Sequence, residues 1–299
     1  MDDVVRAVLV GGSGIFTRAQ ARRSGLSDAQ VTRAVRRREI VRLAPGVYGR
    51  PTEGTPEQRH ATAARAALAA IGEGAYVSHY SALACADLPT YGCDLATEHL
   101  CSARARWRRG GLTMHGLPHG VSPRGTSVPL AVALLQTGLV AGPTAFSASA
   151  DAALRSGAVS RGEIERALAL MSRWPGIAAI RTAATRLDPR AESVGESVAR
   201  ELLHHLGWST EPQYAVATAG RRYRADLRIH GEQVLVEFDG MGKYADSRAL
   251  AVEKRREADL RAAGWEIVRL VWSDLRDAER VRRLVAAAVR RGPVTASVS

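Results

Sequence analysis

The stretch Tyr223-Arg-Ala-Asp-Leu-Arg-Ile229, His230-Gly-Glu232, Gln233-Val-Leu-Val-Glu-Phe238 decides the fold of the last third of this 299-residue chain. Its two outer parts are rich in β-branched and aromatic residues. The three residues between them have the length and the glycine of a hairpin turn. The pattern therefore predicts two short antiparallel strands, Tyr223–Ile229 and Gln233–Phe238.

Acidic residues collect on this hairpin and on the segment before it. Asp226 lies on the first strand, Glu237 and Asp239 lie at the end of the second, and Glu196 falls in a helix expected over Ala191–Leu206. Crowded carboxylates are costly unless a cation or a proton compensates them. Oxygen ligands suit hard divalent ions. We therefore expect a Mg²⁺ (or Mn²⁺) site on the two strands, with Glu196 contributing directly or through water.

The same stretch resembles the very-short-patch-repair-like branch of the PD-(D/E)xK nuclease superfamily. The resemblance implies a restriction-endonuclease-like α/β core over residues 189–299 and metal-dependent hydrolysis of phosphodiester bonds in DNA. The pieces that carry it are Glu192-Ser-Val-Gly-Glu196, Asp226, Glu237-Phe-Asp-Gly240, Lys243-Tyr244, Glu253-Lys-Arg-Arg-Glu257, Leu260-Arg-Ala-Ala-Gly-Trp265, and the closing strand Ile267-Val-Arg-Leu-Val-Trp272 before Ser273-Asp274-Leu275.

The position two residues after Glu237 departs from the family pattern. A lysine there helps to orient or deprotonate the attacking water, and this chain has Asp239. The chain contains two lysines, Lys243 and Lys254, against forty arginines, and both follow Glu237 within a helix length. Lysine titrates when it is partly buried, whereas arginine keeps its proton. We therefore hypothesise that one of them is a migrated catalytic lysine; the alternative is that both are ordinary surface charges.

Composition describes a globular chain with room for two or three domains. Its hydrophobic content of 46% and charged content of 24% are ordinary for a soluble protein. No apolar run reaches the roughly 18–20 residues of a membrane span. The acidic start Met1-Asp2-Asp3 lacks a signal-peptide pattern, so we expect a cytoplasmic location. The net charge of +12 favours a polyanionic partner.

Residues 1–56 have the pattern of a small helical module. Helices are expected over Asp2–Val10, from the cap Thr17 to Arg23, and from the cap Ser27 to Glu39. In the last of these, apolar residues share one face and polar residues the other. The polar face carries Gln30, Arg33, Arg36 and Arg37.

A short hairpin is expected directly after this helix, with Ile40–Leu43 and Val47–Arg50 as its strands. Together with the two helices before it, the hairpin predicts a winged helix-turn-helix. Nine arginines against two acids lie between Thr17 and Arg50. We therefore expect binding to double-stranded DNA through the polar face of the helix and through Arg42; the alternative is a solvated basic helix in a structural domain.

This region resembles the N-terminal domain of the AbiEi family of antitoxins. The resemblance implies operator binding, and it implies a cognate toxin protein as a partner. It also offers a second overall hypothesis, namely a transcriptional regulator of a toxin–antitoxin system whose nuclease fold is catalytically silent. The family pattern has a basic residue where this chain has Pro45. The pieces that carry the resemblance are Gly25-Leu-Ser27, Arg36-Arg-Arg-Glu-Ile-Val-Arg-Leu43, Pro45-Gly-Val-Tyr48, Ser78-His-Tyr-Ser-Ala82 and Leu88-Pro89.

The expected fold class is α+β with several domains: a winged helix-turn-helix over 1–56, a mixed connecting domain over 57–188, and the nuclease-like core over 189–299. Two strands around the basic turn Arg104–Arg109 are expected within the connecting domain. A zinc site from His99, Cys101, His115 and His119 is disfavoured because their spacing fits no zinc-finger pattern. The expected helices of this domain cover 57–71, 78–87, 128–139, 145–154 and 161–172.

Overall fold

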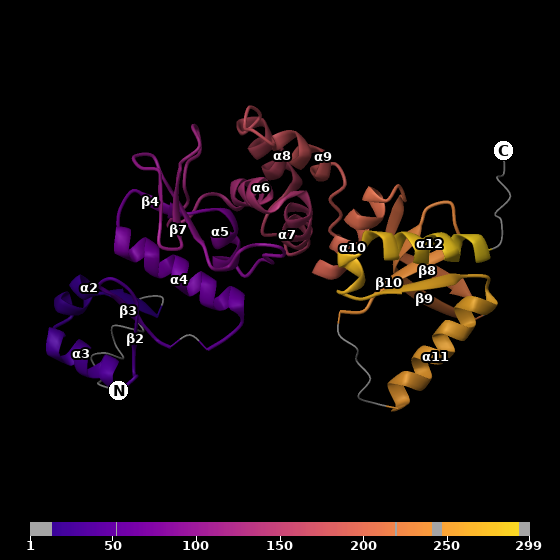
Figure 1. Ribbon diagram of the computed structural model, residues 1–299, viewed down its shortest axis with the longest axis horizontal. Helices are drawn as coiled ribbons and strands as arrows, with labels where there is room; N and C mark the ends of the chain where they lie inside the picture. The colour runs from indigo at the N-terminus through magenta and orange to yellow at the C-terminus, as the bar shows by residue number, and fades with distance from the viewer. Residues whose placement is uncertain (1–13, 52, 219, 241–246, 293–299) are drawn as a thin grey trace. The chain divides into compact units, whose positions relative to one another are not determined.

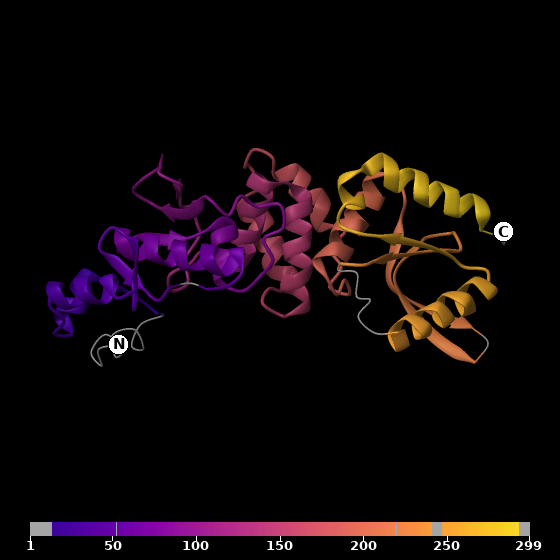
Figure 2. The same ribbon diagram turned by 60° about the horizontal axis from the view of Figure 1, so that its bottom comes forward.

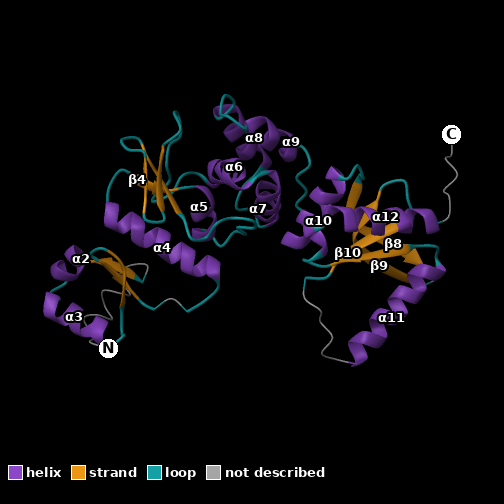
Figure 3. Ribbon diagram, viewed as in Figure 1, coloured by secondary structure: helices purple, strands orange, loops and turns teal. Residues whose placement is uncertain are grey.

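Figure 1 shows the computed structural model, which describes residues 14–51, 53–218, 220–240 and 247–292. The chain divides into two compact units. Unit 1 comprises Met1–Ser149 and Val159–Thr182, and unit 2 comprises Ala150–Ala158 and Ala183–Ser299. Each contains helices and sheets, as the secondary-structure view in Figure 3 makes clear. The fold is therefore a mixed α and β arrangement with several separate sheets, as expected.

The first described elements of unit 1 are the two helices and three strands of a winged helix. The predicted caps Thr17 and Ser27 are confirmed, since each side chain accepts a hydrogen bond from the third helical residue and forms a capping box. The helix expected over Asp2–Val10 lies outside the described residues. The strands pair in the order β1-β3-β2. The elements are β1 (Ile15–Thr17), α2 (Arg18–Arg23), α3 (Asp28–Arg36), β2 (Val41–Ala44) and β3 (Val47–Gly49).

The winged helix has its own apolar core. Phe16 of β1 stacks on Tyr48 of β3 with their ring centroids 5.8 Å apart. The turn between β2 and β3 is two residues long, and Gly46 adopts a φ of +74° there, which other residues avoid. α3 ends at Arg36, three residues before the predicted end, because Arg38 takes the left-handed conformation with a φ of +58°. The core residues are Phe16, Ala21, Leu26, Val31, Ala34, Ile40 and Tyr48.

The remainder of unit 1 packs helices against a four-stranded sheet of order β4-β5-β7-β6. Strands β5 and β7 are parallel neighbours, and β6 and β7 form a hairpin. The prediction of two strands around Arg104–Arg109 was incomplete, because Trp107–Arg109 is itself a strand. The elements are α4 (Pro56–Ile71), β4 (Ala75–Val77), α5 (His79–Cys85), β5 (Glu98–Ser102), β6 (Trp107–Arg109), β7 (Leu112–Gly116), α6 (Leu130–Ala141), α7 (Pro143–Arg155), α8 (Arg161–Leu170) and α9 (Ile177–Ala184).

Unit 2 is built on a four-stranded sheet of order β11-β10-β9-β8, in which only the β10–β11 pair is parallel. The predicted hairpin and closing strand are confirmed as β9, β10 and β11. Figure 2 shows α11 and α12 on opposite sides of this sheet. The elements are α10 (Val194–His205), β8 (Thr210–Thr218), β9 (Arg221–Ile229), β10 (Val234–Phe238), α11 (Ser247–Ala262), β11 (Glu266–Leu270), a 3₁₀ turn (Asp274–Arg276) and α12 (Ala278–Arg291).

Candidate functional site

Asp226 lies where the pairing between β9 and β10 ends. The ladder between these strands comprises the pairs Leu235–Arg228 and Val236–Leu227. Beyond them, the backbone N–H of Phe238 donates to Asp226 Oδ2 at 2.8 Å. The carboxylate thus replaces a backbone carbonyl as the acceptor at this point. It is therefore held in one position between the two strands.

Glu196 reaches the same region from the first turn of α10. Its Oε2 accepts hydrogen bonds from Gln213 Nε2 and from the backbone N–H of Glu192, both at 2.8 Å. Gln213 stands on β8 between the ladder pairs Pro212–Leu227 and Tyr214–Ala225, and its φ of +54° is unusual for a residue other than glycine. Such backbone strain concentrates at functional sites. The sequence pattern gave no signal for Gln213, since a single amide in a strand is unremarkable.

The carboxylates of this site repel one another. The pKa of Asp226 is raised to about 6. Burial is the largest cause, and the charges of Glu196 and Glu237 contribute as well. The Phe238 N–H and Arg256 oppose it without cancelling it. A bound cation would relieve this repulsion. The donor chemistry of Glu196 and Asp226 therefore fits a hard divalent ion.

Glu237 has a different environment, because two arginines already compensate its charge. Arg256 of α11 forms an ion pair with Glu237 Oε1, and Arg269 Nε of β11 lies 3.8 Å from Glu237 Oε2. Both arginines also bind Glu253. The third predicted carboxylate is thus part of an arginine–glutamate network that ties α11 to the sheet. The sequence interpretation looked for a lysine at this place and missed both arginines.

The remaining predicted site residues are Lys243, Lys254 and Asp239. Lys243 falls outside the described residues. Lys254 is exposed on α11, two positions before the arginine that pairs with Glu237. The backbone N–H of Asp239 donates to the carbonyl of Leu270 at 2.9 Å, which continues the contact between β10 and β11 past the end of the strand.

Within the part of the chain that the structure describes, one set of three histidine, cysteine or carboxylate side chains has ligand atoms within 4.8 Å of one another. That set is His79, His99 and His115 of unit 1. The carboxylate oxygens of Glu196, Asp226 and Glu237 do not all lie within that distance of one another. A Mg²⁺ ion at the carboxylates would require their side chains to converge further, and Glu237 would have to leave its arginines.

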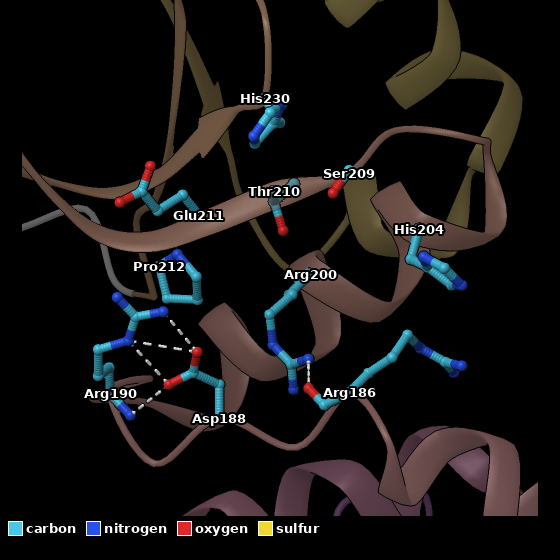
Figure 4. A pocket seen from close by; sticks show the side chains of 10 residues that line it. All are labelled: Arg186, Asp188, Arg190, Arg200, His204, Ser209, Thr210, Glu211, Pro212 and His230. Carbon is cyan, nitrogen blue, oxygen red and sulfur yellow. Dashed lines mark hydrogen bonds and ion pairs between the residues drawn. The ribbon is translucent and has the colours of Figure 1, made fainter.

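A cleft of about 390 Å³ also opens in unit 2, beside α10 and the start of β8. Figure 4 shows its lining, in which Arg190 binds Asp188 and Arg200 donates to the carbonyl of Arg186. Each of the three arginines that line this cleft already forms an ion pair with a carboxylate. None of the predicted carboxylates lines it. The other lining residues are His204, Ser209, Thr210, Glu211, Pro212 and His230.

The second candidate site is the outer face of α3. Arg33, Arg36, Arg37 and, on β2, Arg42 are exposed, and among the described residues none of these four forms an ion pair. Gln30 differs, because its side-chain carbonyl accepts from the backbone N–H of Ser27 at 2.9 Å as part of the cap. The predicted contact residues therefore separate into four available arginines and one glutamine with a structural role.

Comparison with known proteins bears on the winged helix. A family model described as "Transcriptional regulator, AbiEi antitoxin" matches residues 3–51. This finding supports the N-terminal resemblance predicted from sequence, and the family that matches these residues is one of transcriptional regulators. The match ends before the second half of unit 1 and does not reach unit 2.

Two curated relatives are similar over a longer stretch. They are "Uncharacterized protein MT2308" of Mycobacterium tuberculosis (strain CDC 1551 / Oshkosh) and "Uncharacterized protein Rv2248" of Mycobacterium tuberculosis (strain ATCC 25618 / H37Rv). Each is 35% identical over 131 residues, which is 43% of this chain and 48% of the relative. The match therefore spans about half the length of each relative. No helix among the described residues is long and apolar enough to cross a membrane.

Proposed function

We propose that this chain is an antitoxin-type transcriptional regulator that binds operator DNA through α3. The observation that carries the proposal is the group of exposed arginines, two on α3 and one at its C-cap, in a region that matches the AbiEi regulator model. A nine-residue helix is about 14 Å long and fits the major groove. The Ser27 cap fixes the N-terminal end of α3, which is the end that contacts base edges in helix-turn-helix proteins.

The four arginines have different expected roles in this complex. Arg33, near the middle of α3, is our candidate for contact with a base edge, since arginine can bind guanine O6 and N7 together. Arg36 and Arg37 follow at the end of α3, and Arg42 lies on the first strand of the wing. These three are suited to phosphate contacts, which position the protein without reading sequence.

Selection of bound sequences from a random duplex library, followed by fluorescence anisotropy, tests the proposal. We expect Arg33→Ala to weaken binding by about 1–3 kcal/mol and to relax the preference at one or two base pairs. Arg36→Ala should weaken all sequences alike. Arg173→Ala, an exposed arginine elsewhere in unit 1, is the matched control. Selection without any sequence preference, or equal losses in all three variants, would count against operator recognition by α3.

A cognate toxin is the partner that this class implies. Co-expression with the products of adjacent genes tests it. A growth-inhibiting product that is neutralised by the full chain would support the proposal. Repression of the local promoter without any such product would leave a regulator and remove the toxin from the proposal.

We also propose a second activity, Mg²⁺-dependent hydrolysis of DNA in unit 2, because the half-buried carboxylate of Asp226 is repelled by the charges of Glu196 and Glu237, and a bound cation would relieve that repulsion. A divalent ion supplies an acidified water and neutralises charge on the scissile phosphate. Asp226 and Glu196 are the candidate ligands, with Glu237 and Asp239 beside them. Gln213 would keep Glu196 oriented through their hydrogen bond. Lys243 and Lys254 stay the candidates for orienting the water.

Cleavage of supercoiled plasmid with Mg²⁺, Mn²⁺ or EDTA tests this activity. Wild type should nick or linearise the plasmid with metal, and Asp226→Asn and Glu196→Gln should not. Glu232→Gln, on the turn between β9 and β10, controls for loss of an unrelated acid. No cleavage by the wild-type protein, with DNA binding intact, would leave the regulator as the sole proposed function and make the carboxylates a structural feature of the sheet.

A further inference from the structure

Three histidines from separate elements meet in unit 1; we call them the histidine cluster. His79 begins α5, His99 lies on β5 and His115 lies on β7. The rings of His79 and His115 stack with centroids 3.9 Å apart, and each lies 4.9 Å from the ring of His99. One nitrogen from each ring lies within 4.8 Å of the other two. The parallel pairing of β5 and β7 creates this meeting, because it aligns Cys101 with His115 and brings His99 alongside.

The hydrogen bonds around His99 fix the position of its proton. Tyr80 donates its hydroxyl proton to the carbonyl of Asp94 at 2.8 Å. Tyr80 Oη must therefore accept from His99 Nε2, which lies 2.7 Å away. In a neutral imidazole the other nitrogen, Nδ1, then carries a lone pair. That lone pair faces His115 Nε2 at 2.7 Å.

This arrangement is the one that metal-binding histidines use. Such a histidine donates its second ring N–H to a fixed acceptor, and the bond aims the lone pair at the ion. His99 already has that bond. His79 Nδ1 lies 2.9 Å from Ser78 Oγ, and the tautomer with a proton on Nδ1 donates to that hydroxyl in the same way and leaves Nε2 for a ligand.

Burial agrees with this arrangement, since His79 and His99 are 4% and 7% exposed and are therefore shielded from bulk water.

The backbone supplies an independent observation. His79 adopts a φ of +52°, a conformation that costs a histidine free energy and persists where the surroundings impose it. Gln136 Oε1 accepts from the His79 N–H at 3.3 Å. The other end of the same amide, Gln136 Nε2, is buried and has no hydrogen-bond partner in the described structure. Helix α5 thus begins in a strained, incompletely satisfied polar site.

We propose that the histidine cluster binds a transition-metal ion, zinc(II) foremost, with a water in the fourth position. Three imidazoles suit zinc in a tetrahedral site. At Zn–N bonds of about 2.0–2.1 Å, tetrahedral geometry places ligand nitrogens about 3.3 Å apart. His99 Nδ1 and His115 Nε2 are now closer than that, and they separate as the ion enters. The proton on His115 Nε2 moves to Nδ1, so no net proton is released.

The site lies on the sheet of unit 1 and is independent of the DNA-binding proposal. A metal there joins α5, β5 and β7, whose ligands are up to 36 residues apart in sequence. It would stabilise unit 1 according to its affinity and free concentration. The site includes His99 and His115, for which the zinc-finger spacing rules had predicted no zinc site.

Direct binding measurements on the full chain test this proposal. EDTA-treated protein is titrated with ZnCl₂ by calorimetry and with CoCl₂ by absorbance. We expect one tight equivalent of zinc and the visible bands of tetrahedral cobalt(II). His115→Gln should abolish both, whereas His119→Gln, an exposed histidine four residues later, should retain them. Absence of a tight equivalent in the wild type, or its persistence in His115→Gln, would overturn the proposal.

A second variant covers the case in which His115→Gln misfolds. Tyr80→Phe keeps all three ligands and removes the acceptor that orients His99. We expect a loss of zinc affinity of about 10–100-fold with the protein still folded by circular dichroism. Unchanged affinity in folded Tyr80→Phe would show that His99 is not oriented for a metal, and would count against the site.

Discussion

The buried ion pair between Asp151 and Arg200 in unit 2 allows a quantitative test of how this unit is stabilised. Asp151 is fully buried, and Arg200 Nη2 donates to its Oδ2 at 2.6 Å. Ser197 Oγ and the backbone N–H of Asp188 donate to the same carboxylate at 2.7 and 2.8 Å. Burial nevertheless raises the pKa of Asp151 despite these donors. The cost of desolvating this charge therefore exceeds the attraction that its partners supply.

Removal of one partner should be far more harmful than removal of both. Arg200→Met leaves an uncompensated buried carboxylate, and we expect a loss of about 3–5 kcal/mol in the stability of unit 2. Asp151→Leu combined with Arg200→Met removes both charges. The double variant should lose only about 1–3 kcal/mol, chiefly because the Asp188 N–H is left without an acceptor.

Hydrogen exchange of peptides from α10, read by mass spectrometry, measures these losses within unit 2. In Arg200→Met, protection should fall by about two to nearly four powers of ten. The control is Arg190→Met, whose pair with Asp188 is more exposed, with side-chain exposures of 55% and 20%, and should cost under about 1 kcal/mol. A loss below about 1 kcal/mol in Arg200→Met, or a double variant less stable than that single, would refute the desolvation argument.

Three further predictions concern packing, pH and salt. A Cβ on Gly195 would overlap the ring of Phe238, so Gly195→Ala should cost about 1–3 kcal/mol in urea unfolding, whereas Gly162→Ala, where the nearest atom is 3.3 Å away, should not destabilise the protein. Burial lowers the pKa of His60 and of the histidine cluster, so below pH 6.5 the unfolded chain binds more protons than the folded one. With EDTA present, thermal melts of unit 1 should show full stability above pH 6.5 and a loss of up to about 1.4 kcal/mol per pH unit for each histidine as the pH falls; a melting temperature that is flat down to pH 5 would contradict this. If Arg36 contacts one phosphate, Arg36→Ala should reduce the slope of log affinity against log salt by about 0.9, and an unchanged slope would exclude that contact.

The elements predicted correctly from the sequence are those that depend on residues close together in the chain, such as helix caps and hairpin turns. Thr17 and Ser27 cap their helices as expected, because a hydroxyl that accepts from a free N–H of the first turn stabilises the start of a helix. The hairpin of β9 and β10 followed from two segments rich in β-branched and aromatic residues on either side of a short turn that contains glycine. Strand β8 was missed because Pro212 and Gln213 interrupt its pattern; Gln213 has a left-handed backbone and donates a hydrogen bond to Glu196.

The candidate sites were harder to predict, because they depend on distant pairings. The sequence interpretation sought a lysine near Glu237, and the compensating charge came from Arg256 on α11 and Arg269 on β11. A residue in the middle of one helix offers no local sign of which strand it will contact. The histidine cluster has the same origin, since zinc-finger spacing describes ligands in one small motif and this set comes from one helix and two strands.

The two-residue turn between β2 and β3 limits how much sequence one copy of the chain can read. Strand β2 has four residues, so the wing extends only about 13 Å and adds few contacts to those of α3. A single recognition helix with three or four base contacts distinguishes about four base pairs. A sequence of about four base pairs occurs thousands of times by chance in a genome of some 10⁶ base pairs. If α3 reads DNA as proposed, two such sequences about 10 base pairs apart, occupied together by two chains, reduce the chance occurrences from thousands to about fifteen.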